Sequence, residues 1–167
     1  MIIIAAKASE LEILDDDVIN DASRIIITGV GGMNAVKKIL QAVDPSEEDA
    51  LNVGYVGSNS LKVGDKVQIC SVLTHHPGVE FKEKPIQLEL INIEKDAFPC
   101  YTSTDFVTAT NVKGPAVFDM ELAFIAGLNW HSLSAIKQVS DNLNLEQYER
   151  SPKCLWFDCI VDGRGGE

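Results

Sequence analysis

A glycine-rich turn, Thr28-Gly29-Val30-Gly31-Gly32-Met33-Asn34, joins a β-branched run to a segment with apolar residues at helical spacing. We therefore predict a strand, a tight turn and a helix in direct succession. The free N–H groups at such a helix start suit an anion or a polar ligand, although a turn without a ligand explains the pattern equally well. Asn34 stands where a dinucleotide fingerprint has its third glycine, and no Gly-Lys-Ser/Thr of a phosphate-binding loop follows.

Further short apolar runs alternate with helical patterns along the chain. The expected strands are Ile2 to Ala5, Arg24 to Thr28, Asn52 to Val56, Lys66 to Leu73, Ile86 to Ile91 and Leu133 to Val139. The expected helices are Met33 to Val43 and Ala116 to Leu128. Lys62 to Asp65 is typical of a turn, and His76 to Pro85 of a surface loop. This order predicts one domain over residues 1–167, a three-layer α/β/α fold with a mixed central β-sheet and ligand sites at the carboxyl ends of strands.

Composition excludes several classes of function. The 167 residues, 46% of them hydrophobic, suit one globular domain. With 25 acidic residues against 14 basic ones, a net charge of −11 and three arginines, no basic stripe can follow a nucleic acid or an anionic membrane. No apolar stretch approaches the roughly 20 residues of a membrane-spanning helix. We therefore expect neither nucleic acid nor membrane as a partner.

Cysteine spacing argues against a metal centre or a disulfide framework. The four cysteines are scattered, at Cys70, Cys100, Cys154 and Cys159, and the pair His75-His76 has no third ligand at plausible spacing. The apolar start, Met1 to Ala6, lacks the basic region of a signal peptide and predicts a buried strand. We expect reduced thiols, a cytoplasmic protein, and neither metal nor cofactor.

Three more segments could carry chemistry. Asn52 to Ser58 ends in small residues that allow close approach of a ligand, although ordinary close packing explains it equally well. Asp119-Met120-Glu121 begins the second expected helix, where acidic residues usually just complement the helix dipole. Ser140-Asp141-Asn142 closes a strand at the edge where α/β proteins place catalytic groups, and a carboxylate there is also often a helix N-cap.

Taken in order, these segments resemble the purine and uridine phosphorylase superfamily, most closely the 5′-methylthioadenosine/S-adenosylhomocysteine nucleosidases. The matching segments, over about residues 1 to 145, are Ile3 to Ala6 with Glu10, Thr28 to Gly31, Asn52 to Gly57, Leu61 to Asp65, Ser103 to Val107, Phe118 to Glu121 and Val139 to Asp141. The Met120-Glu121 and Ser140-Asp141 pairs are the most specific part of the resemblance.

The resemblance implies roles for the residues around the scissile bond. Cleavage of an N-glycosidic bond builds a cation-like sugar and a purine anion, so the leaving base needs a proton. Asp141 corresponds to the acid that supplies it at N7, and Glu10 to the base that deprotonates the attacking water. Glu121 corresponds to the carboxylate that binds the ribose 2′- and 3′-hydroxyls, and Met120 to the residue packed on the sugar.

The remaining substrate contacts also follow from the resemblance. Phe106 corresponds to the ring stacked on the base, and Val107 to the residue whose backbone binds the base edge. Val30 lines the 5′ side of the sugar. Gly57 and Ser140 are further substrate-binding positions in the matching motifs.

The chain departs from the family in length and in basic residues. It is shorter between Glu10 and Gly29 and between His76 and Asp105, Tyr55 replaces a small hydroxyl residue, and Thr104 replaces a glycine. The phosphate-binding arginines of the phosphorylases have no counterpart here, which favours water as the nucleophile. The uracil-binding Gln-x-Arg is also missing, which favours a purine.

The resemblance therefore implies a purine nucleoside N-ribohydrolase, an enzyme of small molecules that forms a homo-oligomer, a dimer or a hexamer. A phosphate-dependent purine nucleoside phosphorylase and a non-catalytic nucleoside-binding protein remain open. A dehydrogenase built on Gly29-Val30-Gly31 is the weakest alternative.

Overall fold

The computed structural model describes residues 1–75 and 84–150. Its helices and strands, in chain order, are β1 (Ile2–Ala5), η1 (Ala8–Ile13), α1 (Asp16–Asn20), β2 (Arg24–Ile27), α2 (Gly32–Ala42), η2 (Pro45–Glu47), β3 (Asp49–Ser58), β4 (Lys66–Thr74), β5 (Ile86–Gln87), β6 (Ala97–Thr102), β7 (Val117–Asp119), α3 (Leu122–Ala126), β8 (Ser132–Asp141) and α4 (Leu145–Arg150). No helix in these ranges is long and apolar enough to cross a membrane. Most of the expected loop at His76 to Pro85, and Cys154 and Cys159, lie outside the described residues.

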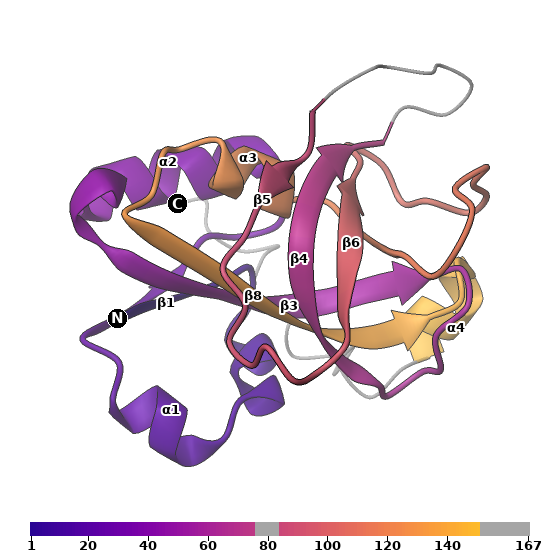
Figure 1. The fold of residues 1–167 in the computed structure, drawn as a ribbon, viewed down its shortest axis with the longest axis horizontal. Helices are drawn as coiled ribbons and strands as arrows, with labels where there is room; N and C mark the ends of the chain where they lie inside the picture. Colours follow the sequence, from indigo (N-terminus) through magenta and orange to yellow (C-terminus); the bar gives the residue numbers. More distant parts are fainter. Residues whose placement is uncertain (76–83, 151–167) are drawn as a thin grey trace, which may run out of the picture.

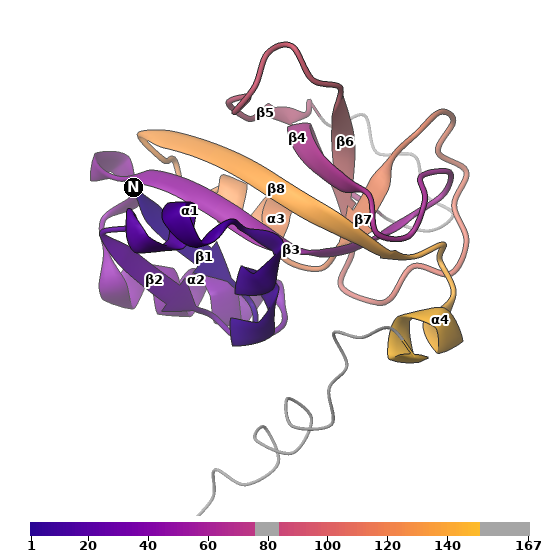
Figure 2. The ribbon, with the colours of Figure 1, turned by 90° about the horizontal axis from the view of Figure 1, so that it is seen from below.

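The described strands form one mixed sheet, as expected. Their order is β2-β1-β3-β7-β6-β4-β5, and β8 pairs with both β3 and β4. β1, β2, β3 and β8 run parallel, with β2 at the outer edge beyond β1 and the two long strands β3 and β8 side by side (Figure 2). Because β7 pairs with both β3 and β6, the strands β3, β8, β4, β6 and β7 also close into a ring. The three-layer arrangement stays a prediction.

The first strand is buried because both of its faces are covered. Ile2 and Ile4 belong to the larger apolar cluster, which includes residues of α2 and α3. Ile3 and Ala5 belong to a second cluster with residues of η1 and α1. Figure 1 shows α2 and α3 on one side of these strands and α1 on the other. Alternate side chains of a strand point to opposite faces, so an unbroken apolar run suits this central position.

The helix predicted over Ala116 to Leu128 is wrong for its first half. The structure has strand β7 there, followed by the short helix α3. Asp119 ends the strand, and its Oδ2 accepts the N–H of Leu122 at 3.0 Å, which satisfies one free donor at the start of α3. The Asp119-Met120-Glu121 segment therefore precedes the helix, and tertiary pairing of β7 overrides the helical pattern.

The strand predicted over Ile86 to Ile91 is also mostly wrong, because only β5, Ile86–Gln87, pairs with β4. Beyond it, the side chain of Gln68 takes the place of a strand partner. Its Oε1 accepts the N–H groups of Ile91 and Asn92, and its Nε2 donates to the carbonyls of Asn92 and Lys95. An amide side chain with two donors and two acceptor sites can hold an irregular segment in this way.

Sequence reasoning missed strand β6, which contains Pro99. The register between β6 and β4 shifts at this point, since Phe98 pairs with Ile69 and Pro99 with Ser71. Proline has no N–H for a strand ladder and is tolerated at such irregularities. A proline in an apolar run argues against a central strand, which explains the missed prediction.

Helices α2 and α3 pack closely at a glycine. A Cβ added to Gly32, in the first turn of α2, would lie 2.1 Å from Cδ2 of Phe124 in α3. The two helices could not keep their present distance with any larger residue there.

We predict that Gly32→Ala lowers the free energy of unfolding by about 1–3 kcal/mol, because the Phe124 ring must move. Gly127→Ala is the matched control, since its Cβ would meet no atom closer than 3.4 Å and its φ is −68°. The control should keep or slightly raise stability. Chemical denaturation measures both, and equal effects of the two substitutions would contradict the prediction.

Candidate active site

A cavity of about 280 Å³ lies at the carboxyl ends of the parallel strands β1, β2, β3 and β8, the edge where we expect ligand sites. It is lined by Ala6, Lys7, Ser9, Glu10, Val30, Tyr55, Val56, Gly57, Phe106, Phe118, Asp119, Met120, Glu121, Ser140, Asp141, Leu145 and Tyr148. Of the site residues named from the sequence, Val107 alone is not among them. It is buried beside the cavity, in a cluster with Ala116 and Phe118.

A larger cavity, of about 690 Å³, lies elsewhere, between η1, α1 and the segment 91–98. None of the site residues named from the sequence lines it. Volume alone therefore does not locate the candidate site, whereas the convergence of carboxylates does.

Asp141 enters the smaller cavity because of an irregularity in β8. Val139 pairs with Val56, but the next residue of β3, Gly57, pairs with Asp141, so Ser140 is an extra residue on β8. Such a bulge re-aims side chains, and the residues Val139, Ser140 and Asp141 are all buried. A Cβ on Gly57 would lie 2.9 Å from Asp141 Oδ1, so glycine leaves the room that this carboxylate occupies.

Two donors hold the Asp141 carboxylate, which is fully buried. Its Oδ1 accepts the N–H of Leu143 at 3.0 Å, in a turn where Leu143 has a φ of +61°. Its Oδ2 lies 2.7 Å from Ser140 Oγ, which is also 3.0 Å from the carbonyl oxygen of Val56. The single hydroxyl hydrogen of Ser140 can serve only one of these oxygens at a time. Ser140 therefore orients Asp141 and can adjust to a change in its protonation.

The glycine turn ahead of α2 binds an anion from its own chain. The N–H of Gly31, which has a φ of +98°, donates to Glu121 Oε1 at 2.8 Å. The donors predicted at this helix start are thus partly used by a carboxylate of the cavity. Asn34 closes the same turn through its Nδ2, which donates to the carbonyl of Val30.

Glu10 faces the cavity from η1. Its Oε2 accepts the N–H groups of Ala6 at 2.6 Å and of Lys7 at 3.2 Å. Burial raises the pKa of Glu10, although the nearby Lys137 ammonium and the backbone donors oppose this shift. The carboxylate can therefore accept a proton more readily than an exposed glutamate.

Sequence reasoning missed Lys137, which is buried behind these carboxylates. Its Nζ lies 3.2 Å from Asp119 Oδ2, and both side chains are at most 3% exposed. Burial alone would lower the pKa of Lys137, but Asp119, Glu121 and Glu10 together hold it above its usual value. The alternation of side chains in β8 could have predicted that Lys137 is buried, because it has the same phase as the buried Ala135 and Val139.

Glu121 is a second acid of the cavity whose pKa is raised. Burial first, and the nearby Asp119 carboxylate second, raise the pKa of Glu121 to about 7, against the opposing Gly31 N–H and Lys137. A carboxyl group with this pKa changes charge near neutral pH, which is typical of functional sites.

Two aromatic rings form the far wall of the cavity. Phe106, in the loop after β6, and Tyr148, in α4, have ring centroids 5.3 Å apart at an interplanar angle of 60°. Sequence reasoning predicted the first ring and missed the second, because α4 lies beyond the matching segments. Flat apolar rings beside a carboxylate suit a heteroaromatic ligand.

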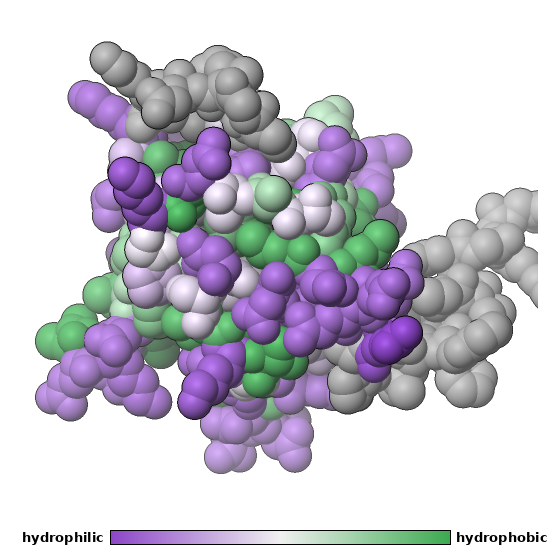
Figure 3. All heavy atoms as spheres, turned by 90° about the vertical axis from the view of Figure 1, so that its right-hand side faces the viewer, coloured by the Kyte–Doolittle hydropathy of each residue, from purple (hydrophilic) through white to green (hydrophobic). Residues whose placement is uncertain are grey.

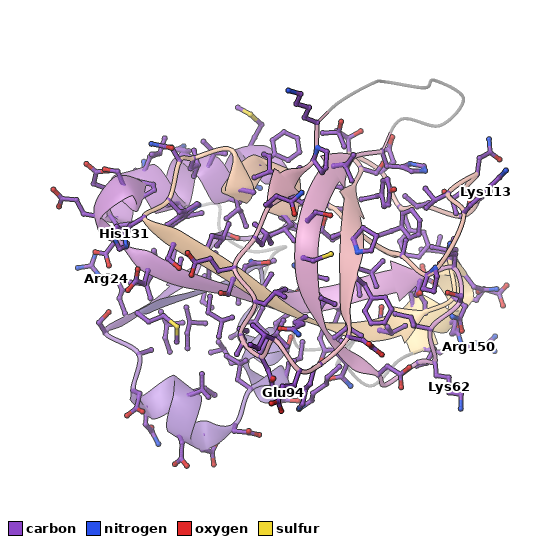
Figure 4. The ribbon with its side chains drawn as sticks, in the orientation of Figure 1. Arg24, Lys62, Glu94, Lys113, His131 and Arg150 are labelled. Carbon is purple, nitrogen blue, oxygen red and sulfur yellow. The ribbon has the colours of Figure 1, made fainter. Side chains whose placement is uncertain are left out.

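Neither of the described arginines lines this cavity. Figure 4 shows Arg24 and Arg150 at opposite ends of the molecule. Arg24 Nη1 donates to the carbonyl of Ala42, and Arg150 pairs with Glu146 at 3.7 Å. The basic residues that line the cavities around the carboxylates are Lys7 and Lys137. No bidentate guanidinium is therefore available to a phosphate from the described residues.

No family model matches the chain, and no curated protein matches it. Solved structures, however, match over most of its length. A Helicobacter pylori 5′-methylthioadenosine/S-adenosyl homocysteine nucleosidase has a TM-score of 0.69 at 14% identity, covering 96% of this chain and 97% of that chain. The H. pylori futalosine hydrolase has a TM-score of 0.68 at 13% identity, covering 96% of each chain. A nucleosidase of the first kind from Chlamydia trachomatis has a TM-score of 0.65 at 18% identity, covering 89% and 84%.

At these identities the likeness concerns the fold. Six of the seven segments that resemble the family in sequence contribute lining residues to the cavity, whereas Leu61 and Asp65 of the seventh line the larger cavity. The chain therefore shares its fold with 5′-methylthioadenosine/S-adenosylhomocysteine nucleosidases and futalosine hydrolase.

Proposed function

We propose that the protein is a nucleosidase that cleaves the N-glycosidic bond of a purine nucleoside, 5′-methylthioadenosine or a related compound, with water as the nucleophile. The observation that carries the proposal is the convergence of Glu10, Glu121 and Asp141 on one cavity of about 280 Å³, within a fold shared with nucleosidases. A site that must stabilise a cation-like sugar while protonating a base requires several acidic groups at close quarters.

In this reaction, the bond between C1′ and the purine nitrogen breaks as a bond from water oxygen to C1′ forms. Asp141 donates a proton to N7 of the leaving purine, so the base departs neutral. Glu10 takes a proton from the attacking water. Glu121 accepts hydrogen bonds from the ribose hydroxyls, and its charge stabilises the positive charge that develops on the sugar. The products are a free purine and a free ribose derivative.

The rest of the cavity positions the substrate. Phe106 stacks on the base, the backbone of Val107 binds its edge, and Met120 packs on the sugar. In this proposal Val30, which is 43% exposed, lines the 5′ side, so the 5′ substituent lies toward solvent. Ser140 and Gly57 act through Asp141, the first by hydrogen bonding and the second by leaving space.

Base release from purified protein tests the proposal. The substrates are 5′-methylthioadenosine, S-adenosylhomocysteine, adenosine and inosine, each with and without phosphate, and chromatography follows the free purine. We expect free purine and free ribose products without phosphate. Ribose 1-phosphate formed only with added phosphate would instead identify a phosphorylase. Binding of adenosine by folded protein without any release would identify a nucleoside-binding protein.

We predict that Asp141→Asn slows base release by about 10²–10⁴-fold, because an amide cannot donate the required proton. Asp105→Asn is the matched control, since Asp105 is exposed and does not line the cavity. Its rate should match the unmodified protein. A normal rate for Asp141→Asn would refute the assignment of the acid.

We also predict an acid limb in the pH profile of kcat/KM. Protonation of Glu121 below pH of about 7 removes the negative charge that the sugar cation needs, so kcat/KM falls as pH decreases through this value.

The raised pKa of Glu121 also makes the folded protein less stable once this group ionises. The folding free energy should therefore weaken as pH rises from about 4.5 to 7, and Glu121→Gln should remove this dependence. An unchanged stability profile in Glu121→Gln would contradict the assignment.

The protein also forms a homo-oligomer in this proposal. Among the described residues, β2 pairs only with β1, and apolar Ile25, Ile27, Val30 and Met33 are exposed beside it and the cavity mouth. The face turned to the viewer in Figure 3, at another side of the molecule, is chiefly hydrophilic with smaller apolar areas. Sedimentation should find an oligomer that Met33→Lys weakens. A monomer at all concentrations would contradict this part of the proposal.

A further inference from the structure

A second, very small cavity of about 10 Å³ adjoins the candidate site. It shares Ala6, Glu10, Tyr55 and Glu121 with the candidate-site cavity of about 280 Å³. Its other lining residues are Thr28, Asn52, Val53, Gly54, Ile125 and Lys137. Its volume matches the roughly 10–15 Å³ that one water molecule needs. With six polar or charged side chains around it, this inner cavity suits a water rather than an apolar group.

Asn52 supplies an unpaired acceptor to the inner cavity. The side chain is 3% exposed, and its Nδ2 donates to the carbonyl of Ile4 at 3.1 Å. Its Oδ1 has no hydrogen-bond partner among the described residues. The amide cannot simply be turned over, because Oδ1 would then face the Ile4 oxygen. A buried oxygen of this kind needs a donor.

Lys137 supplies donors to the same space. An ammonium has three hydrogens, and the Lys137 Nζ has one partner, Asp119, among the hydrogen bonds of the described residues. A Cβ built on Gly54 would lie 3.3 Å from Lys137 Nζ and 3.4 Å from Glu10 Oε1. The missing side chain of Gly54 therefore leaves open the space between the ammonium and the Glu10 carboxylate.

We propose that one buried water occupies the inner cavity, accepting a hydrogen bond from Lys137 Nζ and donating to Asn52 Oδ1 and Glu10 Oε1. Water can bridge polar groups too far apart for a direct bond. Asn52 is then a positioning residue, which fixes the water that links Lys137 to Glu10. The other groups that face Lys137 are Asp119 from β7, Glu121 at the start of α3 and Cys100 from β6.

The water itself is tested without substrate, so this result does not depend on the proposed function. A crystal structure of the full chain, at a resolution that shows ordered waters, should contain one within hydrogen-bond distance of Lys137 Nζ and Asn52 Oδ1. Asn52→Leu should lose this water, whereas Leu51→Val, one residue earlier in the other apolar cluster, should retain it. A direct hydrogen bond between Lys137 and Asn52, or a dry cavity in the unmodified protein, would overturn the proposal.

Oxygen-17 relaxation dispersion in solution counts long-lived buried waters. The count should fall by one in Asn52→Leu and stay unchanged in Leu51→Val, a control one residue earlier in the other apolar cluster. An unchanged count in folded Asn52→Leu would overturn the proposal. The crystal structure and the water count of the unmodified protein still decide the matter if Asn52→Leu does not fold.

The positioning role rests on the proposed function and has its own readout. Without the water, Glu10 loses a donor to its charged form, so the acid limb of kcat should move to higher pH. We expect kcat at neutral pH to fall roughly 3- to 10-fold in Asn52→Leu with little change in KM. Leu51→Val should leave the limb in place. If the crystal contains the water but the acid limb of kcat does not move in Asn52→Leu, the positioning role alone is refuted. If the unmodified protein releases no base, the proposed function is refuted instead.

Discussion

The candidate site depends on the attraction between the buried Lys137 ammonium and the carboxylates around it. Three carboxylates, those of Glu10, Asp119 and Glu121, face it from different elements, and its ion pair with Asp119 is almost fully buried. Like charges at this proximity repel strongly away from water, so a central cation is needed to keep them together. Removing one partner of a buried pair typically costs about 3–5 kcal/mol, because the other charge is left uncompensated. The candidate site therefore requires the ion pair between Lys137 and Asp119 in order to form.

The pairing of the strands in the sheet brings this cluster of charged side chains together. Lys137 lies on β8 beside Gly54 of β3, and Asp119 ends β7, which pairs with the tip of β3. Closure of the strands into a ring brings Asp119, at the end of β7, to Lys137, in the middle of β8. Thr102, at the end of β6, donates its hydroxyl to Asp119 Oδ1 and accepts the N–H of Ala123, so it links the ion pair to α3. The backbone pairing and the side-chain network thus reinforce each other.

Sequence analysis named residues that the structure brings to one cavity, but it placed several of the elements that carry them wrongly. Glu10, Glu121 and Asp141 stand in short motifs whose order along the chain resembles a known family, and the structure brings them to one cavity. The elements depend on long-range pairing, which no local pattern contains. The apolar run after Ala116 has helical spacing, yet strand pairing in β7 and the capping carboxylate of Asp119 divide it. The sequence analysis did not predict Lys137 as a site residue, because a single lysine in an alternating strand normally faces solvent.

The electrostatics of the cavity bear on the choice between water and phosphate. Glu10, Asp119, Glu121 and Asp141 line it, and the Lys137 ammonium already pairs with Asp119. An excess of carboxylates favours a sugar that becomes positive as its bond to the base breaks. The same excess disfavours a phosphate dianion, which would enter beside like charges without an arginine to compensate them. A neutral nucleophile avoids this repulsion, and a carboxylate of raised pKa can take its proton as its oxygen bonds to the cation-like sugar, which leaves the net charge of the cavity unchanged. One charge distribution therefore favours both the cleavage of a glycosidic bond and the use of water to complete it.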